Sequence, residues 1–246
     1  MSVTRRVAAE FRAGWFAFVR RRTAVFFTFL FPVILIVIFG ALVRTGTGGL
    51  FSKPAAYYLP GYLAVVVLFT PLSRVSSTVA RHREGRRFEK LSTTPLSRYE
   101  WLLAHSLVNV VLVVLAGILV LLIALLITGA QFVLSPWLLV FVALGTVLFC
   151  GVGAILGSVA GSQDGAVAAS NAIGLPLLFL SETFVPPDML PAWFRPLMAL
   201  SPLTYFARAS RAVVLGTGGW GVSALVLAVL TVVFFVVGAA LVPWQS

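Results

Sequence analysis

Long apolar runs separated by short polar connections dominate this sequence. Runs of this kind cover residues 24–43, 57–79, 102–128, 136–160, 166–180 and 220–241. Because about 20 apolar residues are needed to cross the hydrocarbon core of a membrane as a helix, we expect each run to be a transmembrane helix. The pattern therefore predicts an all-α membrane protein with six spans, of which the fifth is short and should be kinked at Pro176.

The N-terminal segment, residues 1–23, follows a different pattern. Apolar residues recur there every three or four positions, so that a helix would carry one apolar face with arginines around the rest. We expect an interfacial helix that lies flat on the cytoplasmic side of the membrane, followed by one six-helix domain over residues 24–246. The residues predicted to hold this helix at the interface are Phe11, Trp15, Arg20, Arg21 and Arg22.

Composition agrees with the membrane assignment. Hydrophobic residues make up 60% of the chain and charged residues 10%, with a mean hydropathy of +1.06, whereas ordinary soluble domains carry about 25% charged residues. The net charge of +11 could suggest a nucleic-acid partner. However, the basic residues lie at the ends of apolar runs, where cytoplasmic loops and anionic lipid account for them. We therefore expect membrane lipid, and no nucleic acid, among the partners.

Residues 81–101 form the only long charged segment, between the second and third runs. This segment holds six of the 18 Lys and Arg residues and three of the seven Asp and Glu residues. Pro95 cannot continue a helix, and Ser97 is suited to cap the helix that follows. We therefore expect a short charged surface helix that continues from the second span, then a break, and then the third span.

The distribution of basic residues predicts the orientation. Twelve Lys and Arg side chains lie in the segment 1–23 and in the charged segment, against five in the connections at the other side. The positive-inside rule then places both termini in the cytoplasm and residues 44–56 outside. Arg74 lies near the inner end of the second run, so we expect its side chain to reach the cytoplasmic headgroups; a role in a transport path is the alternative.

Residues 181–217 are too proline-rich to span a membrane and too apolar for an ordinary loop. Short apolar pieces between prolines are typical of re-entrant or interfacial helices, which we expect on the external side. The sequence predicts an external gate formed by Phe184, Pro186, Pro187, Leu190, Pro191, Trp193 and Pro202.

Four glycines follow one another at four-residue steps: Gly153, Gly157, Gly161 and Gly165. On a helix they would leave one face without side chains, which another helix could approach closely. We expect this partner helix to belong to the same chain, with a dimer interface as the alternative.

Candidate catalytic and metal-binding patterns are weak. His82 and His105 are far apart in the sequence, no HExxH motif is present, and the single cysteine is Cys150, so no metal site is predicted. Glu84 and Glu89 would diverge on a helix and have basic neighbours, which argues against an acid–base pair. A secondary carrier or channel is the alternative to an ATP-driven protein, but the predicted spans contain no acidic residue for ion coupling. A phosphate-binding GxxxxGK[ST] loop is also missing, so any nucleotide would be bound by another polypeptide.

Two segments resemble the type-2 ABC transporter permeases. The segment REGRRFEKLSTTPLSRYEWLLAHSL, at residues 83–107, is similar to the family's pattern of an acidic-Gly helix, a Ser/Thr-Pro-Leu-Ser break and the next membrane helix. The segment LSETFVPPDMLPAWFRPLMALSPLTYFARASR, at residues 180–211, is similar to the proline-punctuated external segment of the same family. The resemblance covers essentially the whole chain.

The resemblance implies the permease subunit of an exporter for a drug, lipid or glycolipid, in the cell membrane of a prokaryote. It further implies a second permease subunit, identical or different, and a separate cytoplasmic ABC ATPase that binds ATP and Mg²⁺. This chain itself would bind no cofactor and would not be an enzyme. The residues that the resemblance assigns to coupling with the ATPase are Arg83, Glu84, Gly85, Phe88, Glu89, Leu91 and Pro95.

Overall fold

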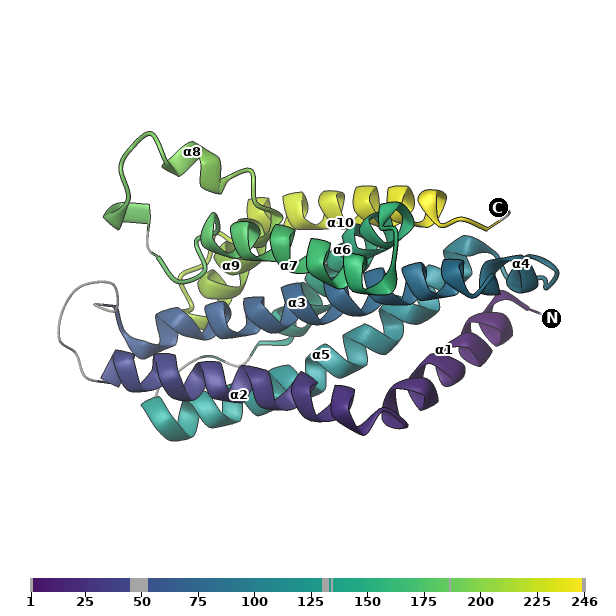
Figure 1. The fold of residues 1–246 in the computed structure, drawn as a ribbon. Helices are drawn as coiled ribbons and strands as arrows, with labels where there is room; N and C mark the ends of the chain where they lie inside the picture. Colours follow the sequence, from purple (N-terminus) through teal and green to yellow (C-terminus); the bar gives the residue numbers. More distant parts are fainter. Residues whose placement is uncertain (1, 45–52, 130–132, 134, 186, 245–246) are drawn as a thin grey trace.

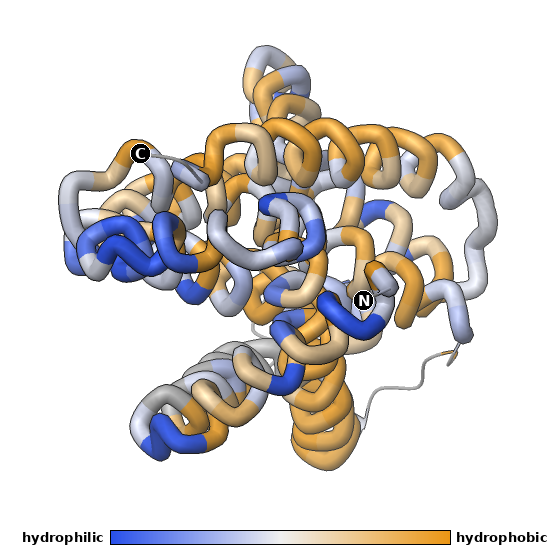
Figure 2. Tube along the Cα trace, turned by 90° about the vertical axis from the view of Figure 1, so that its right-hand side faces the viewer, coloured by the Kyte–Doolittle hydropathy of each residue, from blue (hydrophilic) through white to orange (hydrophobic). Residues whose placement is uncertain are grey.

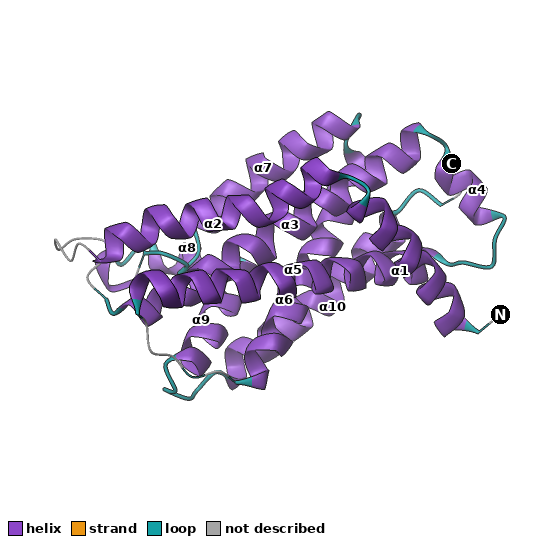
Figure 3. Cartoon of the chain, turned by 90° about the horizontal axis from the view of Figure 1, so that it is seen from below, coloured by secondary structure: helices purple, strands orange, loops and turns teal. Residues whose placement is uncertain are grey.

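A computed structural model describes residues 2–44, 53–129, 133, 135–185 and 187–244, and every regular element in this part of the chain is helical (Figures 1 and 3). The elements are α1 (Val3–Val19), α2 (Arg22–Arg44), α3 (Ala55–Glu84), α4 (Arg87–Ser92), α5 (Arg98–Thr128), α6 (Pro136–Val159), α7 (Gln163–Phe179), the 3-10 helix η1 (Pro187–Met189), α8 (Arg195–Met198), α9 (Pro202–Val214) and α10 (Gly221–Leu241).

The helices form an elongated bundle around α3, which packs against α2, α5, α6, α7 and α9. α10 packs along α6, and α1 packs against α5. Both termini and α4 lie at one end of the bundle, and α8 lies at the other (Figure 1). We call these the charged end and the opposite end. Figure 2 looks at the charged end and shows hydrophilic segments in blue beside the long apolar helices.

Four of the described helices are long and apolar enough to cross a membrane, namely α3, α5, α6 and α10. α2 holds the apolar stretch Thr28–Ile38, and α7 has 17 residues, about 26 Å of helix, which is less than the usual ~30 Å hydrocarbon thickness. The chain is thus a multi-pass membrane protein, while the count of six spans stays a prediction. α7 contains Pro176 and continues to Phe179. The predicted outer connection at residues 44–56 falls largely outside the described residues.

The glycine pattern is explained only in part by packing within the chain. A Cβ atom on Gly153 would lie 2.7 Å from the carbonyl oxygen of Leu72, and one on Gly157 would lie 2.4 Å from that of Ser76. These two glycines therefore let α6 approach α3 closely. The expected continuous face of four is wrong, because α6 ends at Val159 and Gly161 has no atom within 4 Å of its Cβ position.

Replacing Gly157 by alanine is expected to destabilise the bundle by about 1–3 kcal/mol, because the added methyl group overlaps the α3 backbone and two packed helices must separate. Thermal unfolding of the purified protein in detergent would measure the loss. Gly161→Ala is the matched control, since its Cβ would meet no neighbour. Equal melting temperatures for both variants would contradict the packing role of Gly157.

Candidate functional site

The charged segment is divided by a turn that the sequence did not reveal. α3 ends at Glu84, Gly85 follows as its C-cap, and Arg86 adopts a left-handed backbone conformation with φ 49° before α4 begins. The expected continuous helix from the second span to Pro95 is therefore wrong. The predicted break before Pro95 and the cap at Ser97 are confirmed: the Ser97 Oγ atom accepts from the Glu100 amide at 3.2 Å, and the Ser97 amide donates to Glu100 Oε2 at 2.9 Å.

Phe88 attaches α4 to the bundle. Its side chain is 2% exposed, and its ring lies 5.4 Å from that of His82, 5.2 Å from that of Trp101 and 5.7 Å from that of Trp244, measured between centroids. Leu91 packs against the same cluster. Phe88 therefore faces inward, and the part of α4 open to a partner is its charged side. That side is formed by Arg86, Arg87, Glu89 and Lys90, with the exposed Gly85 and Pro95 at the two ends.

Arg83 and Glu84 bind the connection between α6 and α7. The guanidinium of Arg83 donates to the carbonyl of Ser158, at 2.6 Å, and to that of Ala160, while Glu84 Oε1 accepts from the Gln163 amide at 3.0 Å. A cation at the end of one helix and a carboxylate at the start of the next are both favoured by the helix dipoles. These two side chains therefore connect the end of α3 to α6 and α7.

One ion pair and one hydrogen bond fix α1 to α5. Arg6 Nη2 lies 2.5 Å from Glu100 Oε1, and this hydrogen-bonded carboxylate raises the pKa of Arg6 above its usual value. His105 Nε2 lies 3.2 Å from Glu10 Oε1.

Apolar contacts add to these two interactions. Phe11, Trp15 and Phe18 pack against α5, while the arginines that follow α1 are exposed: Arg20, Arg21 and Arg22. The apolar face predicted for α1 is thus used against the chain itself. Its position at a membrane surface stays a prediction.

Arg74 does not extend away from the bundle. Its Nε donates to Asn109 Oδ1 at 3.0 Å, and its guanidinium carbon lies 4.3 Å from the centre of the Phe18 ring. Arg74 therefore contacts both α1 and α5, and its predicted reach toward the cytoplasmic headgroups stays a prediction.

A second polar cluster lies at the opposite end. The buried carboxylate of Glu182 forms an ion pair with Arg208, and this hydrogen bond raises the pKa of the Arg208 guanidinium. Arg211 is 8% exposed, and burial lowers its pKa below the usual value. It donates from Nη2 to the carbonyl of Glu182 at 2.5 Å and from Nε to that of Tyr57 at 3.3 Å, with its guanidinium 4.0 Å from the Tyr57 ring centre.

This cluster joins the segment after α7 to α9 and to the start of α3. We name Glu182, Arg208 and Arg211 the outer clasp. Sequence reasoning missed it, because the basic partners are 26 and 29 residues beyond the acid and no local pattern connects them. The position of Glu182 next to a proline-rich segment was the only available signal.

The residues predicted for the external gate are spread over this end. Phe184 is half-buried, with its ring 6.2 Å from that of Tyr62, and Trp193 is 70% exposed beside Phe194. Pro202 is the first residue of α9. Pro187 and Leu190 are half-buried, Pro191 is exposed, and Pro186 lies outside the described residues.

Comparison with known proteins identifies the family. The sequence profile of the ABC-2 type transporter family matches residues 6–215, from the first turn of α1 through the end of α9. This chain belongs to the ABC-2 type transporter family. It is therefore a permease of the ABC transporter class, a transport subunit of the membrane.

Two relatives are permeases of the same class by name, and each is similar to a large part of this chain. The daunorubicin resistance ABC transporter permease protein DrrB1 of Streptomyces coeruleorubidus is 28% identical over 205 residues, 81% of this ABC-2 chain and 71% of the relative. The protein named "Probable multidrug ABC transporter permease YbhS" of Escherichia coli K12 is 29% identical over 160 residues, 63% of this chain. That match spans only 42% of the second relative's length.

Proposed function

We propose that this chain is the membrane-spanning subunit of an ATP-driven exporter for hydrophobic or amphipathic compounds. In this proposal two permease subunits form the translocation path, and a separate cytoplasmic ABC ATPase supplies the energy. The charged end faces the cytoplasm of a prokaryotic cell, which agrees with the excess of Lys and Arg there. The names of the two relatives, which refer to daunorubicin resistance and to multidrug transport, support a drug-like substrate.

The observation that carries the proposal is the way α4 is attached. Phe88 points inward and holds α4 on the bundle, while Arg86, Glu89 and Lys90 point outward. Charged groups around a small, firmly held helix suit docking into a groove of a soluble partner, where they set specificity and association rate.

The contacts of α3 provide a route for movement from such a partner. α4 is joined to α3 by one turn, and Arg83 and Glu84 connect the end of α3 to α6 and α7. A displacement of α4 would therefore move three helices together, as in rigid-body transitions between the states of a transporter. The half-buried and exposed apolar residues at the opposite end would form the outer gate for the substrate.

Reconstitution into liposomes tests this function. Daunorubicin transport would be measured with this chain alone, with a co-purified ATPase subunit alone and with both together. We expect ATP-dependent transport only when both are present, because this sequence has no phosphate-binding loop and an active exporter needs a coupled source of free energy. An ATPase subunit whose phosphate-binding lysine is replaced is the control.

Transport driven by a proton or ion gradient through this chain alone would overturn the proposal and favour a secondary carrier. Transport of a lipid, but not of daunorubicin, in the complete system would keep the ATP-driven mechanism and change the substrate class.

A further inference from the structure

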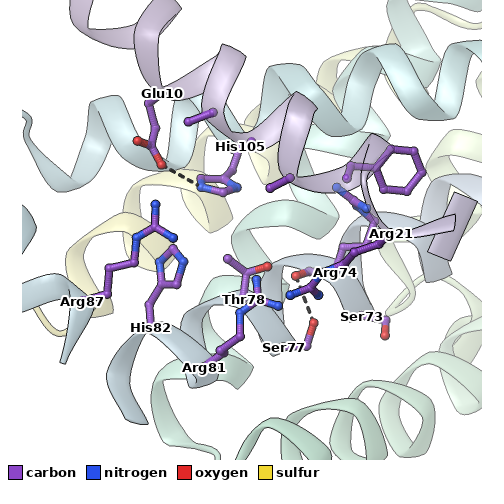
Figure 4. A pocket seen from close by; sticks show the side chains of 14 residues that line it. Glu10, Arg21, Ser73, Arg74, Ser77, Thr78, Arg81, His82, Arg87 and His105 are labelled. Atoms are coloured by element: carbon purple, nitrogen blue, oxygen red, sulfur yellow. Dashed lines mark hydrogen bonds and ion pairs between the residues drawn. The ribbon is translucent and has the colours of Figure 1, made fainter. Parts of the chain in front are cut away.

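A cavity of about 190 Å³ lies at the charged end between α1, α3, α5 and the start of α4. Four arginines line it: Arg21, Arg74, Arg81 and Arg87. The i, i+4 and i+7 spacing brings Arg74, Thr78 and Arg81 to one face of α3, where Ser73 and Ser77 also line the cavity. Figure 4 shows Arg21, Arg74 and Arg81 near one another beside the Ser77 and Thr78 hydroxyls.

The positive charge in this cavity is not neutralised by the chain. Glu10 is the only carboxylate among the lining residues, and it is bound to His105. In the part of the chain that the structure describes, the side chains of Arg21, Arg81 and Arg87 form no hydrogen bond or ion pair. Arg74 is bound to the neutral Asn109 and therefore keeps its charge uncompensated. Among the lining residues, four arginines thus face a single carboxylate, which is already bound to His105.

Further polar groups in the cavity lack partners. The hydroxyls of Ser73 and Thr78 make no side-chain hydrogen bond within the described residues. His82 is 4% exposed and also lines the cavity, and its Nδ1 atom is buried without a partner. Buried polar atoms are normally satisfied, so an unpaired nitrogen beside a cationic cavity is a sign of a missing group.

The chemistry of these groups selects the ligand. A guanidinium presents a planar pair of N–H donors that matches two oxygens of a phosphate, and hydroxyl donors complete such a site. Arg81 is three residues from the end of α3 and Arg74 is ten, about 15 Å along the helix. The cavity is therefore at the depth expected for headgroups next to α1, an amphipathic helix of the kind found at membrane interfaces.

We propose that this cavity binds the phosphate group of an anionic molecule through Arg21, Arg74 and Arg81. A phosphate diester in the headgroup of an anionic phospholipid and a soluble phosphate share this chemistry. Its binding neutralises the repulsion among the arginines and links α1 to α3. Arg87 of α4 lines the edge of this cavity, but the proposed ligands Arg21, Arg74 and Arg81 lie outside the α4 surface proposed for the ATPase. The site does not depend on the direction of transport or on the nature of the substrate.

Lipid binding to the purified full-length protein tests the proposal. Delipidated protein in detergent would be titrated with phosphatidylglycerol or phosphatidylcholine, and bound lipid would be counted by native mass spectrometry. Both lipids carry a phosphate diester, but the choline cation of phosphatidylcholine would be repelled by the arginines of the cavity. We therefore expect phosphatidylglycerol to bind at least about tenfold more tightly than phosphatidylcholine. The double variant Arg21→Gln, Arg81→Gln should lose this preference. It should still fold, because neither side chain contacts the rest of the described chain through a polar bond.

The matched control is Arg5→Gln, Arg12→Gln, which removes the same charge from exposed positions outside the cavity. It should retain the preference. A second variant, Ala17→Trp, fills the cavity while leaving all four arginines in place, and it should also abolish tight binding.

The possible results distinguish a lipid phosphate from a soluble phosphate, and they also show when the proposed site is wrong. Competition by inorganic phosphate at equal concentration would assign the site to a soluble phosphate and support the phosphate chemistry. Equal losses in the cavity and control double variants would show general attraction of anions to basic helices and overturn the site. No preference for phosphatidylglycerol and no effect of phosphate on the unmodified protein would overturn it as well.

Discussion

Replacing Phe88 by alanine is expected to reduce ATP-coupled transport by at least about tenfold, although Phe88 would contact neither ATP nor substrate. Its ring is buried among His82, Trp101 and Trp244. Truncation of a buried phenylalanine costs about 3–5 kcal/mol. α4 has six residues, and a helix of that length is not stable by itself, so it depends on this attachment. Without the ring, a push on α4 would no longer be passed to α3.

The transport assay in liposomes, together with the rate of ATP hydrolysis by the complex, measures this effect. Phe88→Met is the matched control, because a side chain of similar volume should keep most of the packing at a cost below about 1.5 kcal/mol. We expect the alanine variant to insert and fold, since the larger apolar cluster of the bundle, which includes Leu63, Phe141 and Phe206, does not contain Phe88. Normal coupled transport by a well-expressed Phe88→Ala protein would show that α4 does not transmit force.

Replacing Arg211 by methionine is expected to produce the largest loss of stability among single substitutions at the opposite end. The change removes a nearly buried guanidinium and leaves the carbonyls of Tyr57, Glu182 and Thr183 without this donor. Removing one member of a buried charged cluster costs about 3–5 kcal/mol. For a chain of this size, such a loss corresponds to a decrease in melting temperature of roughly 6–20 °C.

Thermal unfolding in detergent, followed by size-exclusion chromatography, measures this decrease. Arg195→Met is the matched control, because Arg195 is an exposed cation at the same end with no polar side-chain contact in the described part of the chain. Arg211→Lys should be intermediate, since a single ammonium cannot reproduce the fork of donors. If the methionine and control variants melt at the same temperature, the outer clasp does not hold the segment after α7.

The helices that sequence pattern predicted best are those with local signals. α5, α6 and α10 are long uninterrupted apolar runs, and Ser97 and Glu100 form a capping box that fixes the start of α5. Such features depend on neighbours in the sequence, so they can be recognised without the fold. The resemblance to the ABC-2 type family was likewise carried by two contiguous segments and is confirmed.

Features that depend on distant partners were not predictable. The end of α3 at Glu84 is one example, because Arg83 and Glu84 bind the connection between α6 and α7, which is far away in the sequence. The direction of Phe88 depends on Trp101 and Trp244, which no spacing rule brings together with it. The cationic cavity similarly needs α1 to be folded back against α3 and α5.

The close contact of α6 with α10 restricts how this protein can change over evolutionary time. A Cβ atom on Gly151 would lie 2.4 Å from the carbonyl oxygen of Phe234, and one on Gly238 would lie 2.5 Å from that of Gly151. Two backbones therefore meet with no side chain between them, and neither position can gain even a methyl group while the other helix stays where it is. A single substitution at either position would push the two helices apart, so it would not be selectively neutral. The two helices are inherited as a matched pair, so exchanging one of them for the corresponding helix of a distant relative would require exchanging the other.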